Sequence, residues 1–155
     1  MQNRSAPPGS VFPVLSYDDV TEAIDWLCHA FGFTERLRAG DSHAQLLAGD
    51  GSIMLGRSRI GQSSDSSDHA ALRPSDSAIV SSLVHVAVDN VDEHFDRATA
   101  FGARILLPPT DYPFGERQYT AEDLAGHRWT FSQSIADIDP RDWGLRCRKP
   151  NERGR

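Results

Sequence analysis

The chain has 155 residues and a formal net charge of −6; 39% of its residues are hydrophobic and 25% are charged. A chain of this length buries roughly 68–70% of its unfolded surface as one domain, so it needs no disulfide or metal to hold it together. The net negative charge disfavours nucleic acid and anionic lipid surfaces as partners. No apolar run is close to the length of about 18 residues that a membrane-spanning helix needs.

The first segment, 1–10, has no apolar run of the kind a signal peptide needs. We therefore predict a flexible N-terminal tail. The two cysteines, Cys28 and Cys147, lie far apart in the sequence and suggest neither a disulfide framework nor a zinc site. These features together predict a cytoplasmic protein.

The segment 11–57 has the pattern of a βαβββ module. A strand-like run over 11–17 leads to Asp19, which has capping-box spacing to Glu22. Apolar residues then recur at helical spacing up to Gly32, where a glycine can end a helix in the left-handed conformation. Three further strand-like runs cover 33–38, 43–48 and 52–56.

The next segment, 58–80, is rich in Ser, Asp and Gly and shows no apolar periodicity. Such a composition favours a linker or a mobile loop. We therefore place the boundary between two modules in this segment.

The segment 81–133 repeats the same succession of elements. A strand-like run over 82–88 leads to Asn90, which has capping-box spacing to Glu93, and the helical pattern stops at Gly102. Three strand-like runs follow over 103–107, 116–121 and 127–133. This order of elements indicates an internal duplication. The remainder, 134–155, is a C-terminal extension with a basic tail.

The second module contains the sequence motifs that are most specific to a known family. It consists of Val86–Asp92, Phe101–Ala103, Pro113–Arg117 and Asp123–Trp129, with Asp139–Gly144 beyond it. These segments resemble the vicinal oxygen chelate superfamily of glyoxalase and bleomycin-resistance proteins, close to its uncharacterised PhnB-like members. The resemblance implies an α+β fold in which two βαβββ modules curl their mixed sheets into a cup that holds a small molecule, and it implies a homodimer.

Metal-dependent members of that superfamily carry a histidine on the first strand and a glutamate on the last strand of each module. By the family spacing, the histidine positions fall on Phe12 and Leu83, and the glutamate positions fall on Leu55 and Thr130. None of these side chains offers an imidazole or a carboxylate to a divalent cation. We therefore expect no metal and no other cofactor, which argues against glyoxalase, extradiol dioxygenase, metal-dependent epimerase and thiol transferase activity.

Strand alternation predicts which side chains face the cup, because successive residues of a strand point to opposite faces. The β-branched stripe Val84, Val86 and Val88 is suited to pack under helices, so the mixed face of the same strand lines the cup. The predicted cup wall comprises Phe12, Val14, Leu55, Arg57, Leu83, His85, Arg128 and Thr130.

For three residues the sequence leaves more than one role open. His85 carries the one imidazole of the predicted wall and is either an acid, base or ligand partner, or a core histidine satisfied by its neighbours. Tyr119 either supplies a phenolic proton or is a half-buried strand aromatic. Arg117 either reaches the cup rim to bind ligand or forms an ion pair there with Glu116.

The sequence thus predicts a metal-free binder of a planar or weakly anionic small molecule, held by His85 and Arg128 in a mostly apolar cup. An alternative is a lyase, isomerase or dioxygenase-like enzyme of this superfamily with a non-standard or metal-free site, for which His85 and Tyr119 are the catalytic candidates. A structural or regulatory dimer with a vestigial cup is the third hypothesis.

Overall fold

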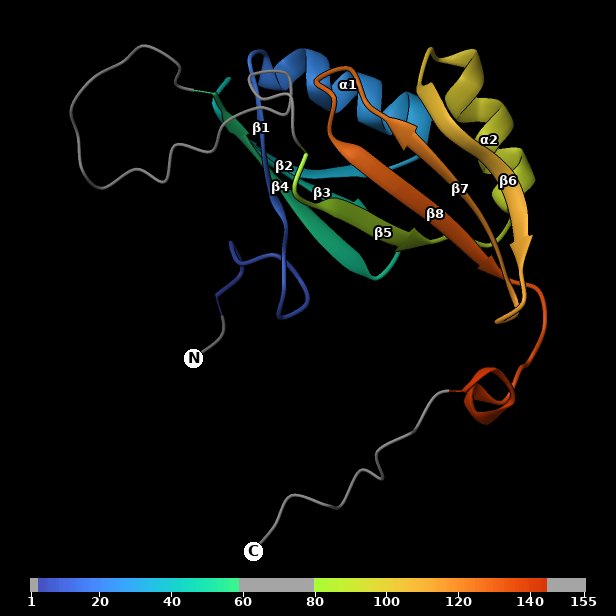
Figure 1. Ribbon diagram of the computed structural model, residues 1–155. Helices are drawn as coiled ribbons and strands as arrows, with labels where there is room; N and C mark the ends of the chain where they lie inside the picture. The colour runs from blue at the N-terminus through green and yellow to red at the C-terminus, as the bar shows by residue number, and fades with distance from the viewer. Residues whose placement is uncertain (1–2, 59–79, 145–155) are drawn as a thin grey trace, which may run out of the picture.

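The computed structural model describes residues 3–58 and 80–144, and within them the chain forms two units of the same kind (Figure 1). Most of the predicted linker and all of the basic tail, including Cys147, lie outside the described residues. None of the helices described is long and apolar enough to cross a membrane.

The first unit is a four-stranded sheet with one helix. Its elements are β1 (Val14–Tyr17), α1 (Val20–Phe31), β2 (Thr34–Ala39), β3 (His43–Ala48) and β4 (Gly51–Arg57). The strand order is β1-β4-β3-β2, with β1 parallel to β4 and the other pairs antiparallel.

The second unit repeats this topology. Its elements are β5 (Leu83–Ala87), α2 (Val91–Ala100), β6 (Arg104–Tyr112), β7 (Glu116–Glu122) and β8 (Arg128–Ser134), and a short 3-10 helix, η2 (Pro140–Trp143), follows. The order β5-β8-β7-β6, with β5 parallel to β8, matches that of the first sheet. The predicted α+β fold of two βαβββ modules is therefore confirmed.

Both helices begin at the capping residues that the sequence predicts. The side chain of Asp19 accepts a hydrogen bond from the backbone N–H of Glu22 at 3.0 Å, and that of Asn90 accepts one from Glu93 at 3.2 Å. Each cap satisfies a backbone donor that has no partner within its helix. Gly32 ends α1 in the left-handed conformation, with φ of 68°.

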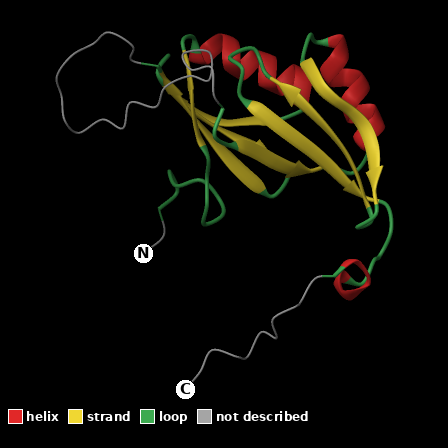
Figure 2. Cartoon of the chain, in the orientation of Figure 1, coloured by secondary structure: helices red, strands yellow, loops and turns green. Residues whose placement is uncertain are grey.

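The two units share one core, in which the helices lie side by side on the same side of both sheets (Figure 2). The ring of Phe31, at the end of α1, packs on Trp129 and Phe131 of the second sheet, at centroid distances of 5.5 and 4.7 Å. The helix-covered faces meet in this core, and the opposite faces of the two sheets carry no helix. The two sheets are therefore not closed on each other within one chain.

A buried carboxylate also joins the two units. Asp123, in the β7–β8 loop, accepts hydrogen bonds from the hydroxyl of Tyr17 at 2.7 Å and from the indole N–H of Trp129 at 3.0 Å. Its other oxygen accepts from the backbone N–H groups of Ala125 and His127, at 2.9 and 3.0 Å. We call this arrangement the Asp123 junction. It fixes the end of β1 to the start of β8 with four donors on one carboxylate.

His94 makes a second polar connection inside the shared core. Its Nε2 lies 3.0 Å from the backbone carbonyl of Phe31 and donates to it, so its Nδ1 accepts from the hydroxyl of Tyr119 at 2.6 Å. Burial, more than any other factor, lowers the pKa of His94 to about 4. Neutral His94 is thus part of the folded state at neutral pH.

This buried histidine predicts a specific loss of stability in acid. Between its ordinary pKa of 6.5 and about 4, the unfolded chain binds a proton that the folded chain rejects, so stability falls as pH falls through that window. From pH 7 to pH 5, wild type should lose about 2 kcal/mol more of its unfolding free energy than His94→Gln does. Urea unfolding of both proteins at the two pH values measures this difference. Equal losses would show that His94 does not titrate as described.

Candidate functional site

A groove of about 680 Å³ runs between β5 and the turn that joins β3 to β4. We call it the β5 groove. It is lined by Val11, Pro13, residues 48–53 of the turn and its flanking strands, and residues 84–89 of β5 and its exit. Its size falls within the range usual for small-molecule sites.

The groove runs along a free strand edge, because β5 is the outermost strand of its sheet. The backbone N–H of Val88 donates to the carbonyl of Ser132 at 2.8 Å, so alternate residues of β5 direct their backbone groups to β8. The intervening residues His85 and Ala87 direct theirs outward. In the part of the chain that the structure describes, no backbone group pairs with this outer edge.

His85 is the one imidazole that lines the groove within the described residues. Its Nε2 lies 2.8 Å from the hydroxyl oxygen of Ser132, and its Nδ1 has no hydrogen-bond partner among the residues described. The imidazole is thus oriented by Ser132 on one side and exposed on the other. Such a side chain can donate to a ligand or accept from it.

The open face of the second sheet brings four predicted wall residues together. Leu83 pairs with Arg128, and His85 pairs with Thr130, so all four side chains point away from the helices. The hydroxyl of Thr130 lies 2.9 Å from that of Thr120 on β7. This face is therefore polar along its centre.

In the first sheet, the predicted face of β4 is wrong. Leu55 is 1% exposed and belongs to the core under α1, and Arg57, at the same parity, pairs with Asp41 at 3.1 Å. The open face instead carries Val14 opposite Met54. The family spacing places the glutamate position four residues after the turn glycine, which is correct for Thr130 after Gly126. In the shorter β3–β4 hairpin the equivalent residue, Met54, comes only three residues after Gly51. A shift of one residue moves every side chain of a strand to the opposite face.

Phe12 precedes β1 and lies beside the N-terminal residues rather than in the groove. A Cβ atom at Gly9 would stand 3.7 Å from its ring, and its neighbours Val11 and Pro13 are the ones that line the groove. Phe12 therefore lies beside the β5 groove and does not line it.

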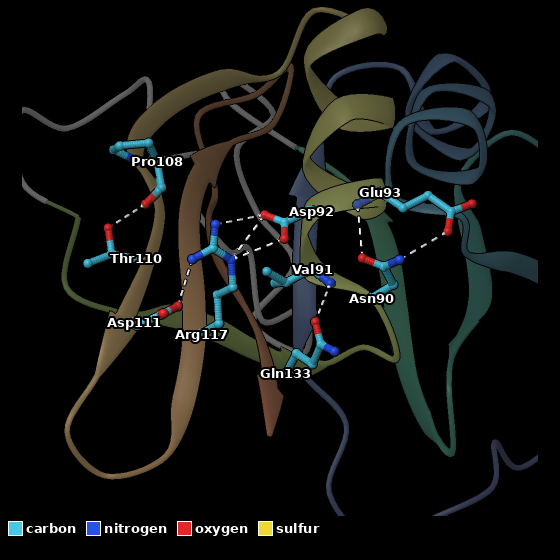
Figure 3. Close-up of polar contacts among 9 residues, drawn as sticks. All are labelled: Asn90, Val91, Asp92, Glu93, Pro108, Thr110, Asp111, Arg117 and Gln133. Carbon is cyan, nitrogen blue, oxygen red and sulfur yellow. Dashed lines mark hydrogen bonds and ion pairs between the residues drawn. The ribbon is translucent and has the colours of Figure 1, made fainter. Parts of the chain in front are cut away.

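Arg117 lies on the helix-facing side of β7 and does not reach the open face (Figure 3). Its guanidinium bridges Asp111 on β6, at 2.6 Å, and Asp92 at the start of α2, at 3.0 Å. The hydrogen bonds that Arg117 donates to Asp111 and, to a smaller extent, to Asp92 raise the pKa of Arg117. The predicted ion pair exists, but its partners are these two aspartates and not Glu116.

Tyr119 lies on the same side of β7, fully buried against the helices. Its hydroxyl is engaged with His94, and burial raises its pKa. Tyr119 is thus a core residue, and the enzyme hypothesis loses one of its two catalytic candidates.

The family metal does not fit the side chains at the corresponding positions. Leu83 and Thr130 occupy two of them, and the strand register replaces Leu55 with Met54 at a third. These side chains offer no imidazole or carboxylate. Over residues 3–58 and 80–144, no group of three or more His, Cys, Asp or Glu side chains could hold a metal ion.

The groove wall formed by the β3–β4 turn was not predicted. The sequence signal for it is the glycine pair that flanks Asp50, which is typical of a tight hairpin turn. That signal predicts the turn itself. It does not predict that the turn packs opposite β5, since this depends on how the two units pack.

Comparison with known proteins identifies the family. The family model described as the Glyoxalase/Bleomycin resistance protein/Dioxygenase superfamily matches residues 11–131. The chain belongs to this superfamily. Closeness to its PhnB-like members stays a prediction.

Several known proteins are similar to this chain. TioX from Micromonospora sp. ML1 is 37% identical, with a TM-score of 0.63, over 82% of this chain and 100% of that one. An uncharacterised protein of Mycobacterium bovis is 27% identical over 132 residues, which are 82% of this chain and 84% of that protein. A lactoylglutathione lyase from Agrobacterium tumefaciens, 18% identical with a TM-score of 0.59 over 90% of this chain and 100% of that one, shares the fold.

Proposed function

We propose that this superfamily member binds a small molecule in the β5 groove without the family metal site. The observation that carries the proposal is the Nδ1 of His85, which has no partner among the described residues and lies beside a free strand edge in a groove of about 680 Å³. Sites of this kind combine apolar walls with a few polar groups that fix the ligand's orientation. The proposal requires binding and no chemical step.

The charges around the groove bear on the kind of ligand. Asp50 and Asp89 both line it, so an anionic group placed near them would be repelled. Arg128 stands on the same open face as His85, but its guanidinium lies 3.3 Å from the carboxylate of Glu122. A neutral, planar ligand with hydrogen-bonding groups fits better than an anionic one.

A homodimer is part of the proposal. No helix covers the outer face of either sheet, although residues 3–10 contact that of the first sheet, and β1 and β5 each stand at a sheet edge. A free edge is a surface on which another chain can pair, and proteins usually cover it. Apposition of the open faces of two copies would enclose the groove.

Replacing His85 with leucine should weaken ligand binding without unfolding the protein. His85 lies on an exposed face while Val84 and Val86 face the core, so His85→Leu keeps the packing. Losing its hydrogen bond to the ligand should reduce affinity about ten- to a hundredfold. Calorimetry with the molecule that co-purifies with the protein measures the affinity.

The matched control is His43→Leu, which makes the same change on an exposed histidine of β3 outside the groove. It should bind like wild type. If His85→Leu also binds like wild type but melts many degrees lower, then His85 is a structural residue and the proposed site is wrong.

A further inference from the structure

The first sheet has an open face of its own, and the chain's N-terminal residues lie across it. Residues 3–10, which we call the N-terminal segment, were predicted as a flexible tail. The guanidinium of Arg36 donates to the carbonyl of Arg4 at 2.8 Å, and the amide of Gln45 donates to that of Ser5 at 3.1 Å. The hydroxyl of Ser52 donates to the carbonyl of Pro8 at 2.9 Å.

The three donors come from three different strands of the first sheet. With the segment in place, Gln45 and Ser52 are only 8% and 3% exposed. A second N–H of Arg36 donates to the side-chain carbonyl of Gln45, which turns the amide N–H₂ of Gln45 toward the segment. The surface therefore presents a row of donors.

The N-terminal segment complements this row, because it offers mainly acceptors. Pro7 and Pro8 have no backbone N–H, and the backbone N–H groups of Ser5 and Ala6 donate within the segment, to the side-chain and backbone oxygens of Asn3. All three contacts between the sheet and the segment run from a side-chain donor to a main-chain carbonyl. Recognition is thus of amide carbonyls and not of particular side chains.

We propose that the open face of the first sheet is a binding site for the carbonyl groups of a peptide or peptide-like ligand, and that the N-terminal segment occupies it as an intramolecular competitor. This goes beyond the ligand of the β5 groove, whose histidine, His85, lies on the second sheet. Ser52 borders both sites, so the segment also lies next to that groove. A ligand rich in amide carbonyls has to displace the segment to bind.

The test compares the intact chain with a chain that lacks residues 1–9. Every core residue lies between Tyr17 and Phe131, so the truncation removes none of them, and thermal melting verifies the fold. The probe is a synthetic peptide of residues 1–10 with a fluorophore at its C-terminus, followed by fluorescence anisotropy. We expect saturable binding to the truncated chain, at least about tenfold tighter than to the intact chain.

Substitutions in the truncated chain test the donors. Gln45→Leu should weaken peptide binding about five- to tenfold, since it removes one donor and releases Arg36. Arg38→Met is the matched control, because Arg38 lies on the other face of β2 and pairs with Glu35. It should bind the peptide like the unmodified truncated chain.

Two results would overturn the proposal: a folded truncated chain that does not bind the peptide, or equal binding by the truncated and intact chains. If the truncated chain does not fold, trypsin cleavage after Arg4 in the intact chain decides the question. Cleavage there should be several-fold faster in Gln45→Leu than in Arg38→Met. Equal rates would show that the segment is not held on the sheet.

Discussion

Replacing Trp129 with alanine should lower the free energy of unfolding by about 3–5 kcal/mol, the range for large-to-small changes of a buried aromatic residue. Trp129 is 0% exposed, and its ring packs on Phe31 and Phe33 of the first unit, each at a centroid distance of 5.5 Å. The change thus leaves a cavity where the two units meet and removes a donor to Asp123. Equilibrium unfolding in urea measures the loss.

The neighbouring residue Arg128 provides the control, since its side chain points to the open face, is 43% exposed and pairs with Glu122 at 3.3 Å. Arg128→Ala should change the unfolding free energy by less than about 1 kcal/mol. A similar loss in both variants would mean that strand β8 does not present one face to the core and the other to solvent.

Replacing Asp123 with alanine should cost about 3–4 kcal/mol, because four donors lose their acceptor in a buried place. Two of them, the hydroxyl of Tyr17 and the indole N–H of Trp129, come from different units. The loss should therefore loosen the joint between the units as well as the loop. Unfolding in urea gives the energy, and hydrogen exchange at the end of β1 shows where the structure opens.

Two variants check this explanation. Leu124→Ala, at an exposed position of the same loop, should change stability by less than about 0.5 kcal/mol. Tyr17→Phe removes a single donor and should cost about 1–2 kcal/mol. If Asp123→Ala unfolds no more easily than Leu124→Ala, the Asp123 junction does not hold the units together.

The sequence predicted most of the local structure because local structure depends on near neighbours. The caps at Asp19 and Asn90 and the stop at Gly32 involve contacts within a few residues, and all are present. On β8 the alternation of Trp129 and Thr130 also gave the right faces. In each case the sequence pattern and the structure that it predicts lie within the same helix or strand.

What the sequence did not predict depends on packing between distant segments. Asp123 has the sequence context of a turn acid, but its partner Tyr17 lies 106 residues away. The face of Leu55 was wrong because Met54, the equivalent of Thr130, lies three residues after Gly51, whereas Thr130 lies four after Gly126, and a shift of one residue reverses a strand. The position of residues 3–10 on the first sheet follows from donors on three strands, which no local pattern reveals.

Native mass spectrometry of freshly isolated full-length protein tests most directly whether the chain is a metal-free small-molecule binder. We predict a species that carries the mass of an organic molecule and no metal ion, and we predict that His85→Leu loses that organic mass under the same conditions. A bound divalent metal ion, about one per chain, that survives dialysis and is lost in His85→Leu would contradict it, and so would an organic ligand that His85→Leu retains in full.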